Sequence, residues 1–162
     1  MSKARRTISR HFRIPFNPTD SLKDWMKFSV LIYGAMPRIL IIDDNEDLRD
    51  LFREVLERDG AEIFEAGDGD EGLEVFKTCR PDLLIVDIVM PEKDGLQLLR
   101  DLGQEAHEAK IMVISGGAGD DWVGTALALG ADRILFKPFR NHELVEIVHD
   151  ILRLDRATDG PE

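Results

Sequence analysis

The chain is 162 residues long and 43% hydrophobic, which is enough for one domain with a substantial buried core. Its net charge is −11 and is unevenly spread: residues 1–35 carry seven Lys or Arg against two Asp, and the rest carries fourteen against thirty Asp or Glu. An acidic body disfavours direct binding to nucleic acid or to an anionic membrane, because both need clustered basic side chains. The single cysteine, Cys79, excludes a disulfide within the chain.

Membrane insertion is not expected. No apolar run approaches the roughly 18 residues of a membrane span, and the apolar piece at residues 25–33 is too short to cross a bilayer. No apolar signal region with a cleavage site is recognisable either. We therefore expect a cytoplasmic protein without a membrane span.

Residues 1–35 differ from the rest of the chain. Their basic residues lack helical spacing, and Pro15 and Pro18 would break an early helix. We interpret this segment as an N-terminal extension that is flexible or not native to the protein, with a targeting or docking arm as the alternative. Met36 then opens a domain predicted to span residues 36–155, and residues 156–162 are predicted to be a polar tail.

Five segments of the domain have the pattern of strands, and each is followed by a segment with helical periodicity. The strands are predicted at residues 38–42, 61–66, 83–87, 111–115 and 134–136. Most are continuous apolar runs, typical of strands buried on both faces, whereas residues 61–66 alternate and suit a position nearer an edge. This (βα)5 order predicts an α/β fold in three layers, with a doubly wound parallel sheet between helices.

Glycines and acidic residues mark where these helices begin and end. Gly60 and Gly130 are predicted to end the first and fourth helices, and Asp70 is predicted to cap the second. A glycine-rich loop is expected at residues 116–119. The last helix is predicted to bury Leu144, Ile147, Val148 and Ile151, and only a polar tail is expected after Leu154.

Polar side chains stand where four of the five strands end. Asp43 and Asp44 follow the first strand, Asp87 ends the third, and the later strands end at Ser115 and Lys137. Because the carboxyl ends of parallel strands share one edge, these residues should converge on one pocket. Three carboxylates held together repel one another, and their oxygen ligands suit Mg²⁺ or Mn²⁺. A carboxylate nucleophile, a divalent ion, a lysine and a hydroxyl can together form and hold an acyl phosphate.

These residues, together with several neighbouring motifs, resemble those of a known family. Residues 37–154 resemble the receiver domain of bacterial two-component response regulators. The motifs that carry this resemblance are Asp43-Asp44, the run Asp87-Ile88-Val89-Met90-Pro91, Asp94-Gly95, Ser115, Gly130-Ala131-Asp132 and Lys137-Pro138-Phe139. The resemblance implies the strand order 2-1-3-4-5 of flavodoxin-like and CheY-like folds, with the acidic residues at the switch point between strands 1 and 3.

The resemblance also implies a role for each of these residues. Asp87 would accept a phosphoryl group from a phosphohistidine. Asp44, Asp87 and the backbone carbonyl of Val89 would ligate Mg²⁺, with Asp43 acting through water. Lys137 would pair with the phosphate and Ser115 would move to bond it. A cis peptide is expected before Pro138.

Two features depart from the family pattern. Many receivers have Tyr or Phe three residues before the lysine, and this chain has Ile134 there, so the usual aromatic switch is not assumed. Val89 and Gly117 stand two residues after Asp87 and Ser115, where the side chain tunes the access of water to the acyl phosphate.

The leading hypothesis is a stand-alone phospho-switch in a two-component phosphorelay. It is not an enzyme beyond catalysing its own phosphorylation and dephosphorylation. Its expected partners are a histidine kinase or a histidine phosphotransfer protein and a downstream protein target, without direct DNA binding. An Mg²⁺-dependent phosphohydrolase with an aspartate nucleophile is the alternative, although Val89 stands where such enzymes have a second acid. A flavin carrier is disfavoured because residues 43–46 would repel its phosphate.

Overall fold

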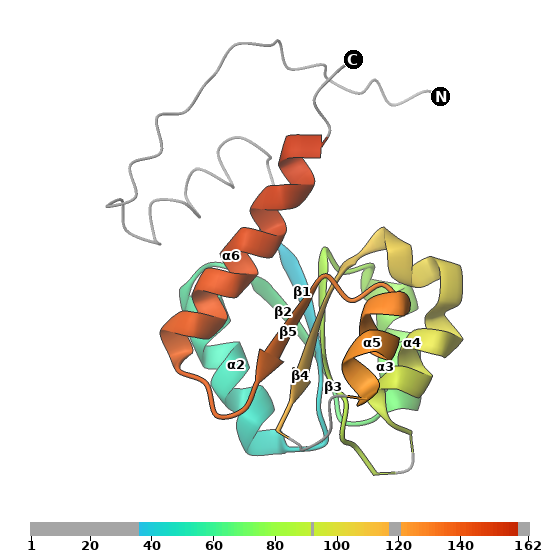
Figure 1. Ribbon diagram of the computed structural model, residues 1–162. Helices are drawn as coiled ribbons and strands as arrows, with labels where there is room; N and C mark the ends of the chain where they lie inside the picture. The colour runs from blue at the N-terminus through green and yellow to red at the C-terminus, as the bar shows by residue number, and fades with distance from the viewer. Residues whose placement is uncertain (1–35, 92, 117–120, 159–162) are drawn as a thin grey trace.

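Five parallel strands form a sheet that lies between two layers of helices (Figure 1). The computed structural model describes residues 36–91, 93–116 and 121–158. The expectations for residues 1–35, for Gly117 and the rest of the glycine-rich loop, and for the end of the tail fall outside these ranges.

The elements follow the predicted alternation of strands and helices. The strands are β1 (Arg38–Ile42), β2 (Glu62–Ala66), β3 (Leu83–Asp87), β4 (Lys110–Ser115) and β5 (Arg133–Phe136). The helices are α2 (Glu46–Arg58), α3 (Gly69–Cys79), α4 (Gly95–Leu102), the 3-10 helix η1 (Gly103–Glu108), α5 (Asp121–Ala128) and α6 (Asn141–Thr158). All neighbouring strands pair in parallel in the order β2-β1-β3-β4-β5, which confirms the predicted α/β sandwich and places β2 at an edge.

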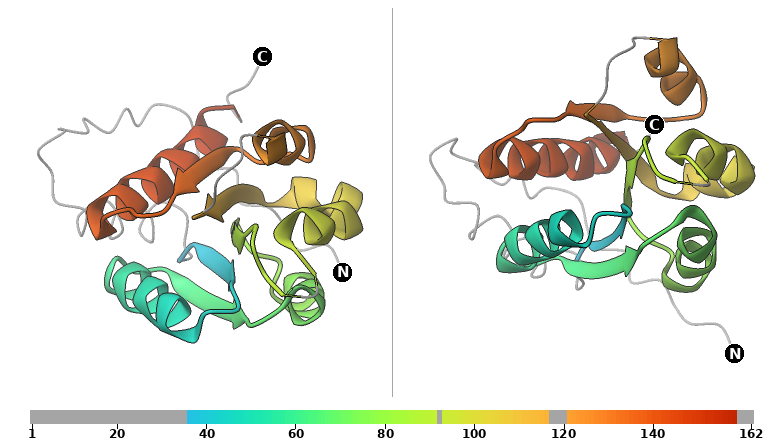
Figure 2. Two further views of the ribbon diagram at one scale, coloured as in Figure 1. Left: turned by 60° about the horizontal axis from the view of Figure 1, so that its bottom comes forward. Right: turned by 90° about the horizontal axis from the view of Figure 1, so that it is seen from below.

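Strands β1, β3 and β4 are buried on both faces because helices cover each face of the sheet, whereas the edge strand β5 is only partly buried. Helices α2 and α6 lie on one face, and α3, α4 and α5 lie on the other (Figure 2). In β1, Ile39 and Ile41 pack against the α2–α6 layer, and Leu40 and Ile42 pack against the opposite layer. Every residue of β3 is buried as well. A strand in this position has no water-facing side, which is why its sequence lacks polar alternation.

The start of α3 differs from the prediction. The sequence favoured Asp70 as the N-cap, but Asp68 occupies that position, and its side chain accepts hydrogen bonds from the backbone N–H groups of Asp70 and Glu71. The helix begins at Gly69, two residues earlier than an Asp70 cap allows. Asp70 instead lies in the first turn, where a negative charge is favourable to the helix.

The chain from α4 onward contains three features that periodicity did not predict. A 3-10 helix, η1, follows α4 directly. Helix α6 continues to Thr158, past residue 155, where the sequence pattern ends the domain. His149 on α6 is buried, and its Nε2 lies 2.5 Å from Oδ2 of Asp59, the C-cap residue of α2. This pair links the two helices of one layer. In the part of the chain that is described, no helix is long and apolar enough to cross a membrane.

Gly95 begins α4 directly against the end of β3. A Cβ atom at Gly95 would lie 2.3 Å from the carbonyl oxygen of Asp87, which is backbone and cannot rotate away. The variant Gly95→Ala should therefore lose about 1–3 kcal/mol of unfolding free energy in urea denaturation.

Gly124 is the matched control for this substitution. It lies within α5, and a Cβ atom added there would meet nothing within 4 Å beyond its chain neighbours and the backbone of its own helix, so Gly124→Ala should keep or raise the stability, by up to about 1 kcal/mol. Equal stability of Gly95→Ala and the parent chain would contradict the close approach.

Candidate metal and phosphoryl site

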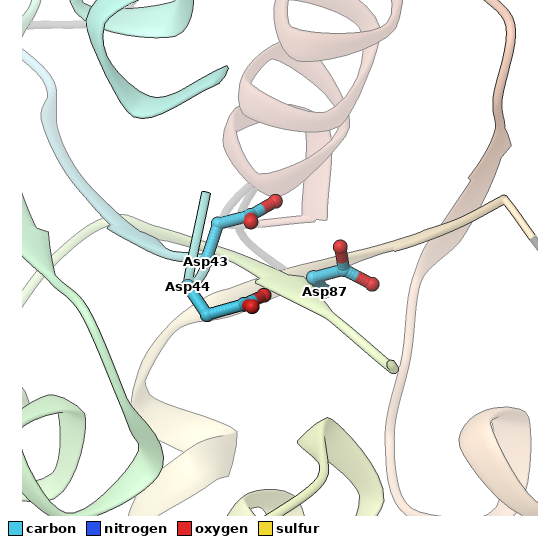
Figure 3. Close-up of side chains that lie close together, drawn as sticks. All are labelled: Asp43, Asp44 and Asp87. Atoms are coloured by element: carbon cyan, nitrogen blue, oxygen red, sulfur yellow. The ribbon is translucent and has the colours of Figure 1, made fainter. Parts of the chain in front are cut away.

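Three carboxylates meet at the carboxyl edge of the sheet. Asp43 and Asp44 follow β1, and Asp87 is the last residue of the neighbouring strand β3. From β1 the chain passes first to β2 on one side and only then to β3 on the other, so this edge is the switch point of the topology. One oxygen from each carboxylate lies within 4.8 Å of the others, and Figure 3 shows the three side chains together.

The protein holds both oxygens of Asp87. Its Oδ1 accepts a hydrogen bond of 2.9 Å from the backbone N–H of Val89, and its Oδ2 lies 2.7 Å from Nζ of Lys137. The Asp87 side chain is 4% exposed, whereas Val89 is 65% exposed beside it. The carboxylate is therefore fixed in orientation but faces an open approach.

Asp43 is the most deeply buried of the three carboxylates. It is 1% exposed, and its Oδ2, which lies 3.8 Å from Nζ of Lys137, accepts no hydrogen bond among the described residues. Burial raises the pKa of Asp43 from 3.8 to about 6; the N–H of Asn45 and the charge of Lys137 oppose this shift, and repulsion from Asp87 adds to it. A buried carboxylate oxygen without a donor is suited to a cation.

A cavity of about 340 Å³ lies over this edge. It is lined by Asp43, Asp44, Asn45, Asp87, Val89, Gly116 and Lys137. The carboxylates and Lys137 were predicted to converge, and the structure brings them together. The donors are all oxygens and Asp44 is exposed, which fits Mg²⁺ held by a few protein ligands and water.

The remaining predicted residues lie at the ends of β4 and β5 or within β5. Ser115 is buried at the end of β4, and its carbonyl accepts a 2.7 Å hydrogen bond from the N–H of Lys137. The peptide between Lys137 and Pro138 is cis, as the family resemblance implied. Ile134 is half-buried in β5 and packs against the α3–α5 layer, so it does not line the cavity.

Three residues around the site were not predicted. Asn45 caps α2 and donates its N–H to Oδ1 of Asp43 at 2.8 Å. Arg49 donates from Nη1 to the carbonyl of Asp43 at 2.7 Å. Gly116 lies so near Lys137 that a Cβ atom would come within 3.2 Å of its Cδ. The position of Asn45 directly after the acidic pair was an available signal, but the contacts of Arg49 and Gly116 depend on tertiary packing.

The raised pKa of Asp43 predicts a pH-dependent cost to folding. The folded chain binds the proton of Asp43 more tightly than the unfolded chain does. Protonation of Asp43 therefore favours the folded state: this stabilisation is complete below about pH 4 and is lost as the pH rises through about 6, where the buried carboxylate ionises. In metal-free buffer, Asp43→Asn should therefore raise the unfolding free energy at pH 7.5 by about 1–3 kcal/mol, and the gain should vanish near pH 4.

Urea denaturation at both pH values with a chelator measures this difference. Asp150→Asn, which removes an exposed carboxylate from α6, is the control and should show no such pH-dependent gain. A variant at Asp43 that is less stable than the parent at pH 7.5 would contradict the assignment.

Comparison with known proteins agrees with this geometry. Residues 39–149 match the family model of the response regulator receiver domain. The transcriptional regulatory protein CpxR of Escherichia coli is 39% identical over 118 residues, which are 73% of this chain but 50% of CpxR. The chemotaxis protein CheY of Halobacterium salinarum is 32% identical over 71% of this chain and 96% of its own length. A CheY-like receiver domain protein from Methanospirillum hungatei superposes with a TM-score of 0.73 at 28% identity, covering 78% of this chain and all of that one.

The extent of these matches differs between relatives. The chain spans about half the length of CpxR, and only the receiver part of that regulator aligns. It spans nearly the whole of the archaeal CheY. Acceptance of a phosphoryl group on aspartate and Mg²⁺ binding are general features of the matched family. The chain belongs to the receiver domains of two-component response regulators.

Proposed function

We propose that Asp87 accepts a phosphoryl group from a histidine kinase or a histidine phosphotransfer protein, and that the phosphorylated chain then binds a downstream protein. The observation that carries this proposal is the position of Asp87. Its side chain is buried, both of its carboxylate oxygens accept hydrogen bonds from the protein, and it lines the cavity. In the transfer, the P–N bond of the phosphohistidine breaks as an Asp87 oxygen forms the new P–O bond. The electron pair stays on the histidine nitrogen.

The acidic residues around Asp87 fit the metal that this reaction uses. We assign Asp44, Asp87 and the backbone carbonyl of Val89 as ligands of Mg²⁺, with Asp43 acting through water. When bound, Mg²⁺ supplies positive charge that offsets the phosphoryl oxygens and the crowded carboxylates. Mn²⁺ offers the same oxygen-seeking chemistry and is an acceptable substitute.

Lys137 and Ser115 are the groups that would recognise the phosphate. Lys137 now pairs with Asp87 at 2.7 Å, and the transferred group would offer its ammonium three new oxygens. The hydroxyl of Ser115 ends the adjacent strand and would donate to one of them. Such a charge-assisted hydrogen bond contributes about 1.5–3 kcal/mol, enough to shift a conformational equilibrium roughly ten-fold or more.

We infer that the signal leaves the site through β5 and α5 with little change at Ile134. Phe136 lies opposite Ser115 in the strand register and directly precedes Lys137. Its ring is 6.0 Å from that of Trp122 on α5, and 53% of Phe136 is exposed. Phe136 is therefore exposed next to the phosphate-sensing residues, whereas Trp122 is half-buried against the α3–α5 layer.

The proposed action is that of a switch read by a partner protein in the cytoplasm, where histidine kinases use ATP. The domain catalyses only its own phosphorylation and dephosphorylation in this proposal. Direct DNA binding by the domain is disfavoured by the excess of thirty Asp or Glu over fourteen Lys or Arg after residue 35.

Phosphorylation can be measured by intact mass after treatment with a small phosphodonor such as acetyl phosphate and Mg²⁺. The parent chain should gain one phosphoryl group, because among the described residues only Asp87 lines the cavity with both carboxylate oxygens hydrogen-bonded to the protein. Asp87→Asn should gain none, and a chelator should abolish the gain in the parent.

The exposed residue Asp150 supplies the matched control, since Asp150→Asn makes the same chemical change away from the site. It should be phosphorylated like the parent chain. Undiminished labelling of Asp87→Asn, or labelling that is indifferent to the chelator, would overturn the proposal.

A further inference from the structure

The loop between β3 and α4 carries Val89, whose carbonyl is one of the proposed metal ligands. Its first half is tied to the sheet: the N–H of Ile88 donates to the carbonyl of Ile114 at 3.0 Å. The N–H of Gly95 donates back to the carbonyl of Ile88 at 3.1 Å, which closes the loop onto the strand end. The conformation at Val89 therefore depends on how the far half of the loop is held.

Lys93 holds this far half by contacts to two different helices. Its Nζ lies 2.9 Å from Oδ1 of Asp70 in the first turn of α3 and 2.6 Å from Oδ2 of Asp101 on α4. Asp101 is itself oriented by a 2.8 Å hydrogen bond from Nε2 of Gln97. One side chain thus joins α3, α4 and the loop.

The aliphatic part of the Lys93 side chain is also closely packed. A Cβ atom at the buried Gly69 would lie 2.7 Å from Cδ and 2.9 Å from Cγ of Lys93, so the stem crosses the start of α3 at a point where only a glycine leaves room. The Lys93 side chain is 17% exposed, unlike a freely solvated surface lysine. This packing limits the positions that residues 93–95 can adopt.

We propose that Lys93 is a positioning residue for the metal site, which acts by clamping the β3–α4 loop to α3 and α4 so that the Val89 carbonyl is presented to Mg²⁺. This inference rests on the proposed function for the identity of the metal ligands. Lys93 touches neither the metal nor the phosphoryl group in this role. Its effect reaches Val89 through the N–H of Gly95, which donates to the carbonyl of Ile88.

The sign of the change in Mg²⁺ affinity when Lys93 is removed distinguishes a positioning role from a purely electrostatic one. A lysine that acted only as a nearby positive charge would weaken cation binding, so its removal would tighten Mg²⁺ binding. A lysine that positions the loop has the opposite effect, and its removal weakens Mg²⁺ binding. Residues that orient ligands from outside the first coordination sphere typically contribute ten-fold or more to metal affinity.

Titration of the full-length chain with Mg²⁺, followed by amide chemical shifts in NMR spectra, measures this affinity directly. Lys93→Met should raise the dissociation constant about ten-fold relative to the parent. Lys93→Arg, which can keep both ion pairs, should remain near the parent value. Lys77→Met, which removes an exposed lysine from the last turn of α3, is the charge control. It should not weaken Mg²⁺ binding.

A second measurement on the metal-free chain tests the clamp itself. Amide hydrogen exchange at Val89 and Gly95, whose N–H groups donate to Asp87 Oδ1 and to the Ile88 carbonyl, should become faster in Lys93→Met and stay unchanged in Lys77→Met. If Lys93→Met does not fold, Lys93→Gln takes its place with the same expectations.

The outcomes distinguish this inference from the proposed function. A parent chain without Mg²⁺-dependent shifts would overturn the metal site, and with it the proposed function. A parent that binds Mg²⁺ while Lys93→Met binds it equally well or more tightly, or shows unchanged exchange at Val89 and Gly95, would overturn the role of Lys93 alone.

Discussion

Repulsion among Asp43, Asp44 and Asp87 is the constraint on which the rest of this structure depends. The fold brings one oxygen of each carboxylate within 4.8 Å of the others and buries two of the three side chains. Lys137 offsets part of this charge through contacts with Asp87 and Asp43. Burial of the Asp43 carboxylate, with repulsion from Asp87 added to it, costs folding free energy and raises the pKa of Asp43. The same charge favours a divalent cation and, with it, a phosphoryl group.

The architecture explains how this cost is tolerated. Helices cover both faces of the sheet, and the apolar residues of β1 and β3 stabilise the core up to the point where the carboxylates begin. Backbone groups then fix the side chains: the N–H of Asn45 binds Asp43, and the N–H of Val89 binds Asp87. A site preorganised by strand ends needs little movement to accept its ligand. Beyond Val89, the hydrogen bond from the N–H of Gly95 to the Ile88 carbonyl and the ion pairs of Lys93 restrain the loop.

The sequence predicted the sheet and the converging strand ends well because both follow from short-range patterns. Continuous apolar runs identified the buried strands, and a polar residue at the end of each run identified the shared edge. Features set by tertiary contacts were not predictable in this way. The cap of α3 is Asp68 rather than Asp70, because the folded backbone places the Asp68 carboxylate against the free N–H groups of Asp70 and Glu71. The pair of His149 with Asp59 joins residues ninety positions apart, and the contacts of Lys93 reach two helices that no local pattern connects.

The central claim is that a divalent cation relieves the repulsion at this edge of the sheet. Urea denaturation with and without Mg²⁺, at a constant ionic strength, tests it most directly. Mg²⁺ at ten to a hundred times its dissociation constant should stabilise the parent chain by about 1.4–2.7 kcal/mol. Asp44→Asn, which removes an exposed ligand and leaves the core intact, should lose most of this gain. Equal unfolding free energies of the parent with and without Mg²⁺ would contradict the account.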